Sequence, residues 1–325
     1  MRDGTVYAED VQFNRTVTNM ETQQAGRATI VVLTHNRRMQ VLGTLDCLCR
    51  LPGKWPIVVV DNGSTDGTAR AIASRFPSVM LIRAKRNMGA AARNFGVAYA
   101  QTPYVAFCDD DTQWEPGALE RAITLLDNSP SVAVVSACVQ VGATRRPDPT
   151  CLSMAQSPLA REQLPGPQLL GFMAGACVMR TSAFYEVGGY WPPFFIGGEE
   201  ALMALDLVER GWRIVYADDV ITRHFPSLSR DTRLRERLLI RNAIWVAWMR
   251  RPFRAAWHET NVQWRAARDR GIAWPTMVQM VLGLPRALRY RKVVSPAVES
   301  MRALLDITAG SPGTPVSQNP DRRTA

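Results

Sequence analysis

Three adjacent aspartates, Asp109, Asp110 and Asp111, directly follow a run of apolar residues at 104–108. Like charges at neighbouring positions repel one another, so three carboxylates at the end of a buried segment call for a positive partner. Aspartates spaced i, i+2 at a strand end place their oxygens on the same side, which suits a hard divalent cation such as Mg²⁺ or Mn²⁺. That cation suits a diphosphate, because it neutralises charge that develops as the diphosphate leaves. The alternative is a charged turn in which one aspartate caps the next helix.

The residues before these aspartates alternate between apolar strands and helices, which is typical of a parallel sheet covered on both faces. Apolar and β-branched runs predict strands within 28–36, 56–61, 79–87 and 104–111. Helical spacing predicts helices at 39–51, 68–76 and 89–100, the second of them capped by Ser64 or Thr65. The fold class is therefore α/β, with a mostly parallel sheet flanked by helices.

Each of these four strands ends in a polar cluster. The clusters are Thr34-His35-Asn36, Asp61-Asn62-Gly63-Ser64, Arg86-Asn87 and Asp109-Asp110-Asp111. In open parallel sheets, ligands bind beyond the carboxyl ends of the strands. A surface loop would explain any one cluster, but four clusters at corresponding positions favour a single binding crevice.

The second half of the chain changes character. We predict helices at 114–128 and 201–212, strands at 131–141 and 213–219, and a strand with a turn into a short helix at 169–190. The Pro-rich stretch 144–168 is too long for a simple connection and is expected to be a lid or disordered. Residues 1–27 are expected to form an irregular lead-in and residues 231–292 to be mainly helical. The tail 306–325, rich in Pro, Thr and Ser, is expected to be disordered.

The net charge of the 325-residue chain is +10, and its basic excess is concentrated near the C-terminus. Between Arg223 and Lys292 there are sixteen Arg or Lys residues against four acidic ones. Such a segment suits nucleic acid, an anionic membrane or a phosphorylated substrate, so charge alone does not select the partner.

The cellular compartment is predicted from the cysteines and from the lack of a signal peptide or a membrane-spanning segment in the sequence. Six cysteines without paired CxxC spacing are expected to be reduced thiols, and zinc is not expected. The N-terminus lacks the apolar core of a signal peptide, which predicts a cytoplasmic protein. The apolar run 243–249 is far shorter than the roughly 20 residues that span a bilayer, so no integral membrane helix is expected there.

A series of motifs in residues 28–226 resembles the inverting nucleotide-sugar glycosyltransferases of family 2, which have the Rossmann-like GT-A fold. The motifs, in order, are TIVVLTHNR, IVVVDNGSTDGT, RNMGAAARNFG, AFCDDDTQWEPGAL, FMAGACVMRTSAFYEVGGY, FFIGGEEALMALDL and YADDVITRHF. The resemblance implies a catalytic domain at 28–226, with a nucleotide-binding half at 28–111 and an acceptor half at 112–226. A basic, Trp-rich helical extension at 227–305 follows it.

The resemblance also implies the reaction. A sugar would move with inversion from a nucleotide diphosphate sugar, with UDP or dTDP favoured over GDP, to a hydroxyl acceptor, and Mg²⁺ or Mn²⁺ would assist. The acceptor would be a glycan or a lipid-linked saccharide of cell-surface polysaccharide synthesis. Two alternatives are a non-catalytic basic scaffold or nucleic-acid-binding protein on the same fold, and a sugar nucleotidyltransferase. The sequence has no nucleic-acid-binding motif, and THNRRMQ lacks the glycines of a triphosphate loop.

The family pattern assigns nucleotide contacts to positions of this chain. Asp61 would bond the base or ribose, Gly89 would permit close backbone approach, and Arg93 would face a phosphate or orient Asp109. For Arg93 the alternative is a surface salt bridge on its helix. The complete predicted nucleotide set is Thr34, His35, Asn36, Asp61, Asn87, Gly89, Arg93, Asp109 and Asp110.

The same pattern implies a metal site made by Asp111, Asp109 and His224. Asp111 would be the more direct ligand, while Asp109 would lie nearer the ribose. A neutral imidazole is a competent ligand for such a metal. A lone histidine is more often a packed or surface residue, and this is the alternative for His224.

Inversion requires a carboxylate that takes the proton of the acceptor hydroxyl. Glu199 and Glu200 are the candidates, at the start of a predicted helix whose dipole favours the anionic form. The family usually has Glu-Asp or Asp-Asp here, so the Glu-Glu pair leaves open which residue is the base, and we favour Glu199. The alternative is a charge pair that only serves the helix dipole.

Five residues are predicted to contact the sugar or acceptor: Gly175, Ala176, Trp191, Phe194 and Phe195. The two small residues would give room, and the aromatic rings would stack on an apolar sugar face. An aromatic cluster that caps the core is an equal alternative.

Tryptophans and arginines alternate in residues 238–257, including Trp245, Trp248, Arg250 and Arg251. This pattern suits a helix at the interface of an anionic membrane, which would place the protein peripherally on the inner face of the cell membrane. The alternative is that these helices pack on the catalytic domain or on a second subunit, which would make a homo-oligomer.

Overall fold

The four strands predicted in the first half lie side by side in one sheet of a computed structural model, which describes residues 11–13, 26–161, 163–226 and 232–309. They are β2 (Ala28–Thr34), β3 (Ile57–Asp61), β4 (Met80–Ala84) and β5 (Tyr104–Asp109), all parallel, in the order β4-β3-β2-β5. Thr34 pairs with Asp61, and Leu33 pairs with Asp109, so these strand ends meet at one edge. The predicted parallel sheet of residues 28–111 is confirmed.

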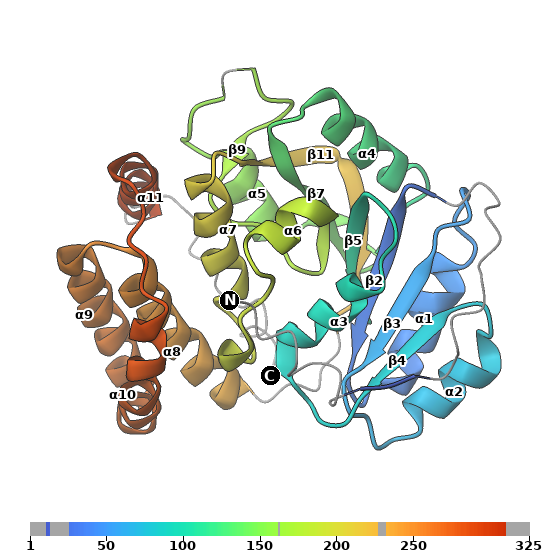
Figure 1. Ribbon diagram of the computed structural model, residues 1–325, viewed down its shortest axis with the longest axis horizontal. Helices are drawn as coiled ribbons and strands as arrows, with labels where there is room; N and C mark the ends of the chain where they lie inside the picture. The colour runs from blue at the N-terminus through green and yellow to red at the C-terminus, as the bar shows by residue number, and fades with distance from the viewer. Residues whose placement is uncertain (1–10, 14–25, 162, 227–231, 310–325) are drawn as a thin grey trace.

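Helices flank this part of the sheet (Figure 1). They are α1 (Arg38–Leu48), α2 (Thr68–Arg75) and α3 (Arg93–Ala98), the last preceded by the 3₁₀ turn η1 (Gly89–Ala92). Helix α2 begins differently from our prediction, because its N-cap is Gly67 and neither Ser64 nor Thr65 caps it. The Asp66 carboxylate instead accepts a hydrogen bond from the Thr68 amide at 3.0 Å.

The second half continues the same sheet with mixed strand directions. β10 (Ala176–Arg180) is antiparallel to both β5 and β7 (Val132–Val141), whereas β11 (Arg213–His224) is parallel to β7. The short strand β6 (Thr112–Trp114) pairs with the end of β11. Helices α4 (Ala118–Asn128), α6 (Thr181–Glu186) and α7 (Glu199–Glu209) also belong to this half.

Two segments that we expected to be irregular contain regular structure. The Pro-rich stretch 144–168 includes β8 (Arg146–Pro147), α5 (Pro149–Ala155) and β9 (Gln168–Leu169), and Cys151 of α5 is fully buried. Within the lead-in 1–27, β1 (Val11–Phe13) pairs antiparallel with β4. For β1, β8 and β9 the sheet supplies hydrogen-bond partners that local composition does not reveal.

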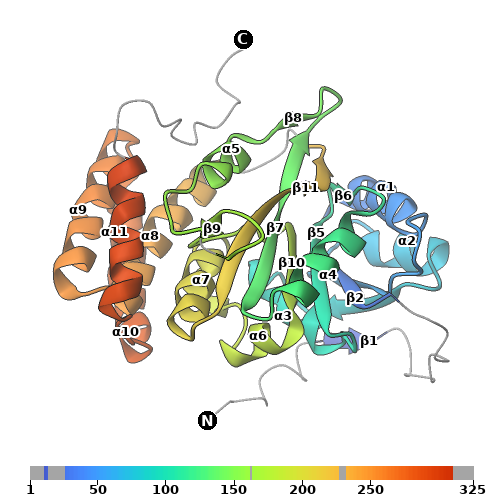
Figure 2. The same ribbon diagram turned by 90° about the horizontal axis from the view of Figure 1, so that it is seen from above.

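Four helices follow the sheet: α8 (Thr232–Arg250), α9 (Phe253–Asp269), α10 (Ala273–Arg289) and α11 (Pro296–Ala309). Figures 1 and 2 show them as a group on the α7 side of the molecule. Helix α11 extends to Ala309, so residues 306–309 of the predicted disordered tail are helical, and the rest of that tail lies outside the described residues.

The helical group shares its core with the sheet domain. Trp245, Met249 and Val298 belong to the same buried apolar cluster as the strands. The bidentate ion pair between Arg250 and Asp206 joins α8 to α7. Helix α8 therefore does not present Trp245 and Arg250 to a membrane as we predicted: Trp245 is 4 % exposed and Arg250 9 %. None of the described helices combines the length and the apolar character that crossing a membrane requires.

Candidate active site

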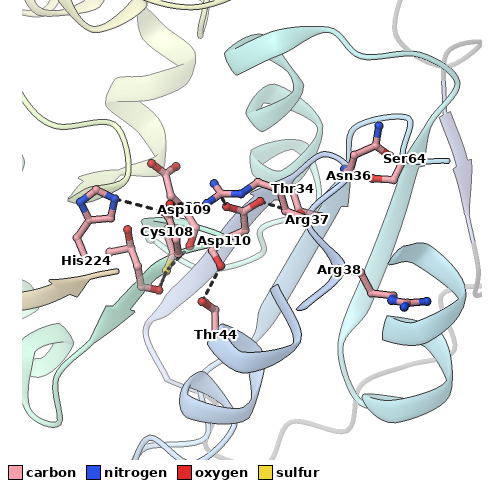
Figure 3. A network of polar contacts seen from close by, with 12 residues as sticks. Thr34, Asn36, Arg37, Arg38, Thr44, Ser64, Cys108, Asp109, Asp110 and His224 are labelled. Atoms are coloured by element: carbon pink, nitrogen blue, oxygen red, sulfur yellow. Dashed lines mark hydrogen bonds and ion pairs between the residues drawn. The ribbon is translucent and has the colours of Figure 1, made fainter. Parts of the chain in front are cut away.

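Arg37 holds two of the three aspartates at the end of β5 (Figure 3). Its guanidinium donates to Asp110 Oδ1 at 2.6 Å and to Asp111 Oδ2 at 2.7 Å. Thr34, at the end of β2, donates its hydroxyl proton to Asp110 Oδ2 at 2.9 Å. The positive partner that three adjacent carboxylates require is thus supplied by the chain itself. We call Arg37, Asp109, Asp110 and Asp111 the aspartate cluster.

The two buried aspartates of the cluster differ in charge state. Burial raises the pKa of Asp110 to about 7, against the opposing effect of Arg37. Burial also acts to raise the pKa of Asp111, but hydrogen bonds from His224 and Arg37 outweigh it and lower that pKa to about 2. At neutral pH Asp111 is therefore ionised, whereas Asp110 is about half protonated.

His224 reaches the aspartate cluster through strand pairing. It is the last residue of β11 and pairs with Thr112 of β6, the residue that follows Asp111. Its Nε2 lies 3.5 Å from Asp111 Oδ1, and the Phe225 amide donates to the Asp111 carbonyl at 2.9 Å. The structure brings these two predicted metal ligands together from positions more than a hundred residues apart. Within the described residues, no three Asp, Glu, His or Cys side chains are assembled as a metal site.

The third aspartate, Asp109, is bound by Arg93. Arg93 is buried at the start of α3 and donates Nη2–H to Asp109 Oδ1. The charge of Asp109 raises the pKa of Arg93 despite the burial, so its guanidinium is always charged. Gly175 lies against the same carboxylate, and a Cβ there would overlap both carboxylate oxygens. Glycine at 175 therefore gives Asp109 its space, and the 44 % exposed Asp109 side chain keeps an open side.

The remaining predicted nucleotide residues form a hydrogen-bonded wall between β3 and η1. Buried Asn62 donates to Asn87 Oδ1 at 2.9 Å and to the Gly89 carbonyl at 3.0 Å, while its own Oδ1 accepts from the Met88 amide. Asp61 accepts from the Ser64 amide at 3.1 Å. The ring of His35 contacts the Asn62 carbonyl through Nδ1 at 2.9 Å.

Asn36 continues this wall toward α2. It has a φ of 52°, a left-handed conformation that Asn tolerates better than most residues. Its amide donates to Ser64 Oγ at 2.9 Å and its Oδ1 accepts from the Thr65 amide at 2.8 Å. The two loops that follow β2 and β3 are therefore tied together.

The loop 193–198, which we call the glutamate loop because it leads into Glu199, contains a strained turn. Phe195 has φ 67° and ψ −60°, and the Ile196 amide donates to the Phe194 carbonyl at 2.9 Å. This is a γ-turn with positive φ, which costs a bulky residue about 1–3 kcal/mol unless its surroundings enforce it. The Ala90 amide donates to the Phe195 carbonyl at 2.6 Å, and a Cβ on Gly89 would collide with that carbonyl. Gly89 is thus required for packing against the glutamate loop.

Glu199 and Glu200 form the first turn of α7 and lie close enough to affect each other. Burial raises the pKa of Glu199, and the backbone N–H groups of Glu199 and Gly197 act against this. Burial and the charge of Glu199 raise the pKa of Glu200 to about 8. Arg93 lowers the pKa of both glutamates and also binds Asp109, so one buried cation links the glutamate pair to the aspartate cluster.

Comparison with known proteins shows which protein family these residues resemble. A model of glycosyl transferase family 2 matches residues 29–188. Residues 29–188 are a domain of glycosyl transferase family 2. The matched residues, which form a glycosyltransferase domain, contain the aspartate cluster, Arg93 and Gly175, whereas the glutamate pair, His224 and the four C-terminal helices lie beyond them.

Two curated relatives of this chain are bacterial. The N-acetylglucosaminyl-diphospho-decaprenol L-rhamnosyltransferase of Mycobacterium tuberculosis is 25 % identical over 52 % of this chain and 66 % of its own length. The amylovoran biosynthesis glycosyltransferase AmsB of Erwinia amylovora is 31 % identical over 30 % of this chain and 35 % of its own length. The chain thus has relatives in cell-surface polysaccharide synthesis, and it spans just under two thirds of the rhamnosyltransferase.

Two solved structures share the fold. The mannosyltransferase PcManGT from Pyrobaculum calidifontis, in complex with GDP-Man and Mn²⁺, is 18 % identical and covers 88 % of each chain with a TM-score of 0.53. TarS 1-349 of S. aureus, in complex with UDP-GlcNAc, is 14 % identical and covers 85 % of this chain and 83 % of its own, with a TM-score of 0.55. At these identities the likeness establishes the fold, which is the GT-A type expected from the sequence.

The aromatic residues of the chain correct one part of our prediction. Phe194 is 1 % exposed and its ring packs on Trp191 and Trp245, with centroids 4.9 and 6.5 Å away. A ring buried in this way has no face for a sugar, so the alternative of an aromatic cluster that caps the core describes Phe194. Trp191 also packs edge-on against Tyr290 at the end of α10. Ala176 is buried opposite Cys108 in the sheet, beside the Asp109 turn.

Sequence reasoning missed four polar residues of the site. Arg37 and Asn62 stand in motifs that we quoted, THNR and DNGS, but we assigned roles only to their neighbours. Both residues could have been predicted from the sequence, because they directly follow the ends of strands that we had placed at the binding crevice. The other two, Arg241 and Asn242, lie in α8 and hydrogen-bond the carbonyls of the glutamate loop. No local pattern connects them to residues 193–198.

Proposed function

We propose that this protein is an inverting glycosyltransferase that moves a sugar from a nucleotide diphosphate sugar to a hydroxyl of a saccharide acceptor. The observation that carries the proposal is the bridge made by Arg93, which binds Asp109 and lowers the pKa of Glu199 and Glu200. Carboxylates for the nucleotide and carboxylates for the acceptor therefore line one site. We call the aspartate cluster the donor side and the glutamate loop with Glu199 and Glu200 the acceptor side.

The reaction needs one proton transfer and one displacement. A glutamate takes the proton of the acceptor hydroxyl while that oxygen bonds to the anomeric carbon. The bond between the anomeric carbon and the diphosphate oxygen breaks, and its electron pair leaves with the nucleoside diphosphate. Attack from the side opposite the leaving group inverts the anomeric configuration.

We assign the role of base to Glu200, although the sequence led us to favour Glu199. Glu200 is half-buried, yet the buried core residues Cys177 and Tyr190 feel its charge. This combination of depth and partial exposure is expected at the floor of a cleft. A pKa of about 8 also makes Glu200 a stronger base than an ordinary carboxylate. Glu199 is 5 % exposed and raises the pKa of its neighbour.

Asp111 and His224 would hold a divalent cation, with Asp109 beside them. The donor set fits Mn²⁺ or Mg²⁺, because it combines an ionised carboxylate with an imidazole 3.5 Å away. When bound, the metal would neutralise the charge that develops on the departing diphosphate. Arg37 donates to Asp111 and would compete with the metal for that carboxylate.

Nucleotide binding tests the donor side. Isothermal titration of UDP, dTDP and GDP, each with and without Mn²⁺ or Mg²⁺, is compared between the wild type and Asp111→Ala. We expect one nucleotide, UDP or dTDP, to bind in a metal-dependent manner, and the variant to lose that binding. If none of the three binds under either condition, the aspartates do not hold a nucleotide diphosphate.

The acceptor is proposed to be lipid-linked, as the name of the mycobacterial rhamnosyltransferase says of that protein. An exposed face of α10 fits the surface of an anionic membrane. Trp274, Val278, Val281 and Leu282 lie at helical spacing and are 71, 40, 55 and 77 % exposed. The helix has no acidic residue, and it ends with Arg286 and Arg289. Apolar residues beside arginines suit anionic headgroups, each cation adding about 1 kcal/mol.

The position of this face relative to the acceptor side supports the same partner. The Arg286 guanidinium lies 6.0 Å from the ring of Trp191, and the Tyr290 ring packs on that same side chain. Trp191 directly precedes the turn η2 (Pro192–Phe194) that begins the glutamate loop. A membrane bound at α10 would therefore lie beside the acceptor side of the site.

Vesicle flotation tests this surface with the full chain. We expect binding to phosphatidylcholine vesicles that contain phosphatidylglycerol, weaker binding at high salt, and loss of binding in the double variant Trp274→Glu, Leu282→Glu. Leu152→Glu, an equally drastic change on α5, is the matched control and should bind as the wild type does. The membrane proposal would be overturned if the wild type did not bind vesicles but formed a stable dimer, and the double variant were a monomer. The exposed face of α10 would then be a subunit interface.

A further inference from the structure

Two consecutive residues of α8 bind four of the six backbone carbonyls of the glutamate loop. Asn242 is fully buried, and its side-chain amide donates to the carbonyls of Phe194 at 2.9 Å, Ile196 at 3.0 Å and Gly197 at 2.5 Å. Arg241 donates Nη2–H to the carbonyls of Pro193 at 3.2 Å and Phe194 at 2.9 Å. The loop is thus held by side chains from the C-terminal helices, outside the residues that match the family model.

Arg241 has an unusual environment for a cation. It is 9 % exposed, and within the described part of the chain it forms no ion pair with a carboxylate. Its Nε–H donates to Asn242 Oδ1 at 2.9 Å, and its guanidinium lies 4.2 Å from the ring of Trp245. Burial lowers the pKa of Arg241 to about 10, so the side chain stays charged at neutral pH. A desolvated charge with only carbonyl and ring partners is costly, which indicates that holding these carbonyls has a function.

The loop that these residues hold is itself constrained from both sides. Gly197 and Gly198 have φ of 77° and 93°, and a Cβ on Gly198 would lie 2.9 Å from Asn242 Cβ. On the opposite side the Ala90 amide donates to Phe195 at the strained γ-turn. Without both sets of hydrogen bonds, nothing would enforce the positive φ of Phe195.

The contacts continue from the loop to the glutamate pair. The Gly197 carbonyl is bound by Asn242, and the backbone N–H of Gly197 acts on the Glu199 carboxylate. Glu199 in turn raises the pKa of Glu200. The charges with the largest effects on the two glutamates include Arg93 and Asp109, whereas the direct contacts of Arg241 are with the loop, so we place its influence in the loop.

We propose that Arg241 and Asn242 are positioning residues of the active site, which fix the glutamate loop and thereby the orientation and burial of Glu199 and Glu200. The C-terminal helices are then a part of the catalytic unit. This inference rests on the proposed function for its kinetic consequence, but the constraint on the loop does not.

Hydrogen–deuterium exchange measures the constraint without any assay of transfer. In Asn242→Asp the carbonyls of the loop would face a carboxylate in place of an amide donor, and we expect faster exchange in residues 193–200 while β2 and β5 stay protected. Asn261→Asp makes the same change on the exposed surface of α9 and should leave the loop unchanged. Equal exchange in the loop of Asn242→Asp and wild type would overturn the proposal, whatever the catalytic activity.

Kinetics then tests the positioning of the base. We expect Asn242→Asp to lower kcat about 100-fold, the size of effect that small misplacements of catalytic groups produce, with nucleotide affinity unchanged. The acid limb of the pH profile should move to lower pH, because a looser loop admits water and burial is the largest cause of the raised pKa values. Arg241→Lys, which keeps the charge, should recover part of the activity that Arg241→Gln loses.

The exposed Arg235 of α8 supplies the matched control, Arg235→Gln, which should behave as the wild type. Suppose that the variants lower kcat only in proportion to the fraction of folded protein, and that the acid limb of the pH profile stays at the wild-type pH. Arg241 and Asn242 would then have a structural role only, and the proposal would be overturned. If the wild type transfers no sugar while the exchange result is as expected, the proposed function fails and the constraint stands.

Discussion

On the donor side of the candidate site the polar side chains hold one another, whereas on the acceptor side they are held by residues of another element. Arg37 binds Asp110 and Asp111 directly, and all three follow the ends of neighbouring parallel strands. Glu199 and Glu200 instead follow a strained loop whose carbonyls are bound by α8. The donor side is formed by residues that follow two neighbouring strands, β2 and β5. The acceptor side also depends on a helix, α8, that comes later in the chain.

This difference predicts where the chemistry is most sensitive. A cluster of mutually paired charges tolerates the loss of one partner by rearranging, although it loses stability. A single base on a constrained loop has no substitute. The acceptor side should therefore show the largest effects on rate, and the donor side the largest effects on stability and nucleotide affinity.

The sharpest test of the comparison is Glu200→Gln, which keeps the shape of the side chain and removes its basicity. Because general base catalysis contributes about 10²–10⁴-fold, we expect kcat to fall about 1000-fold while nucleotide affinity by isothermal titration stays unchanged. Glu120→Gln, in the exposed first turn of α4, is the control and should have no effect. A larger loss from Glu199→Gln than from Glu200→Gln would exchange the roles that we assign to the two residues.

The pH profile gives a second measure of the acceptor side. The base must be deprotonated, and its pKa is about 8, so activity should decline as the pH falls below that value. The negative charge of Glu199 raises this pKa, so Glu199→Gln should shift the acid limb of kcat/KM to lower pH. An acid limb at the ordinary glutamate value in the wild type would show that Glu200 is not the group that titrates.

On the donor side, Arg37→Ala should act on stability. The variant leaves two buried carboxylates without this cation, and breaking a buried pair of this kind costs about 3 kcal/mol in the free energy of unfolding. Mn²⁺ should restore part of that stability, because a metal that binds only the folded state stabilises it. Urea unfolding with and without Mn²⁺ measures both effects.

The neighbouring exposed residue provides the control for this prediction. Arg38→Ala should change the free energy of unfolding by less than about 0.5 kcal/mol, as surface substitutions usually do. If Mn²⁺ stabilises the wild type and Arg37→Ala equally, Arg37 and the metal do not share the aspartates, and the donor side is not the self-contained cluster that we describe.

The two sides also differ in how far the sequence predicted them. Asp109 and Asp111 were predicted from the motif at the end of a strand and His224 from the family resemblance, and the pairing of His224 with Thr112 brings its ring to Asp111. Arg37 was missed although it lies in the quoted motif THNR, because the sequence does not indicate which way a side chain turns. The positive partner that the aspartates needed was thus one residue beyond those we named.

On the acceptor side the sequence predicted less. The aromatic residues around Phe194 have the composition of a sugar platform, and only the packing of Trp245 from α8 shows that Phe194 is core. The same helix has a Trp-rich and Arg-rich pattern that suggests a membrane interface, yet its arginines bind Asp206 and the carbonyls of the glutamate loop. These are tertiary contacts between segments more than 40 residues apart, and no local periodicity encodes them.

The smallest effect that we predict concerns the open side of Asp109. In Gly175→Ala the new Cβ would meet the Asp109 carboxylate and turn it from its place beside Arg93, so metal-dependent nucleotide affinity should fall by about tenfold. Asp109 is partly exposed and can turn outward, so the free energy of unfolding should change by less than about 1 kcal/mol. Gly171→Ala is the matched control, because a Cβ there has no heavy atom within 4 Å. A loss of stability without a loss of nucleotide affinity would mean that Gly175 serves the packing of β10, and that Asp109 is held by Arg93 alone.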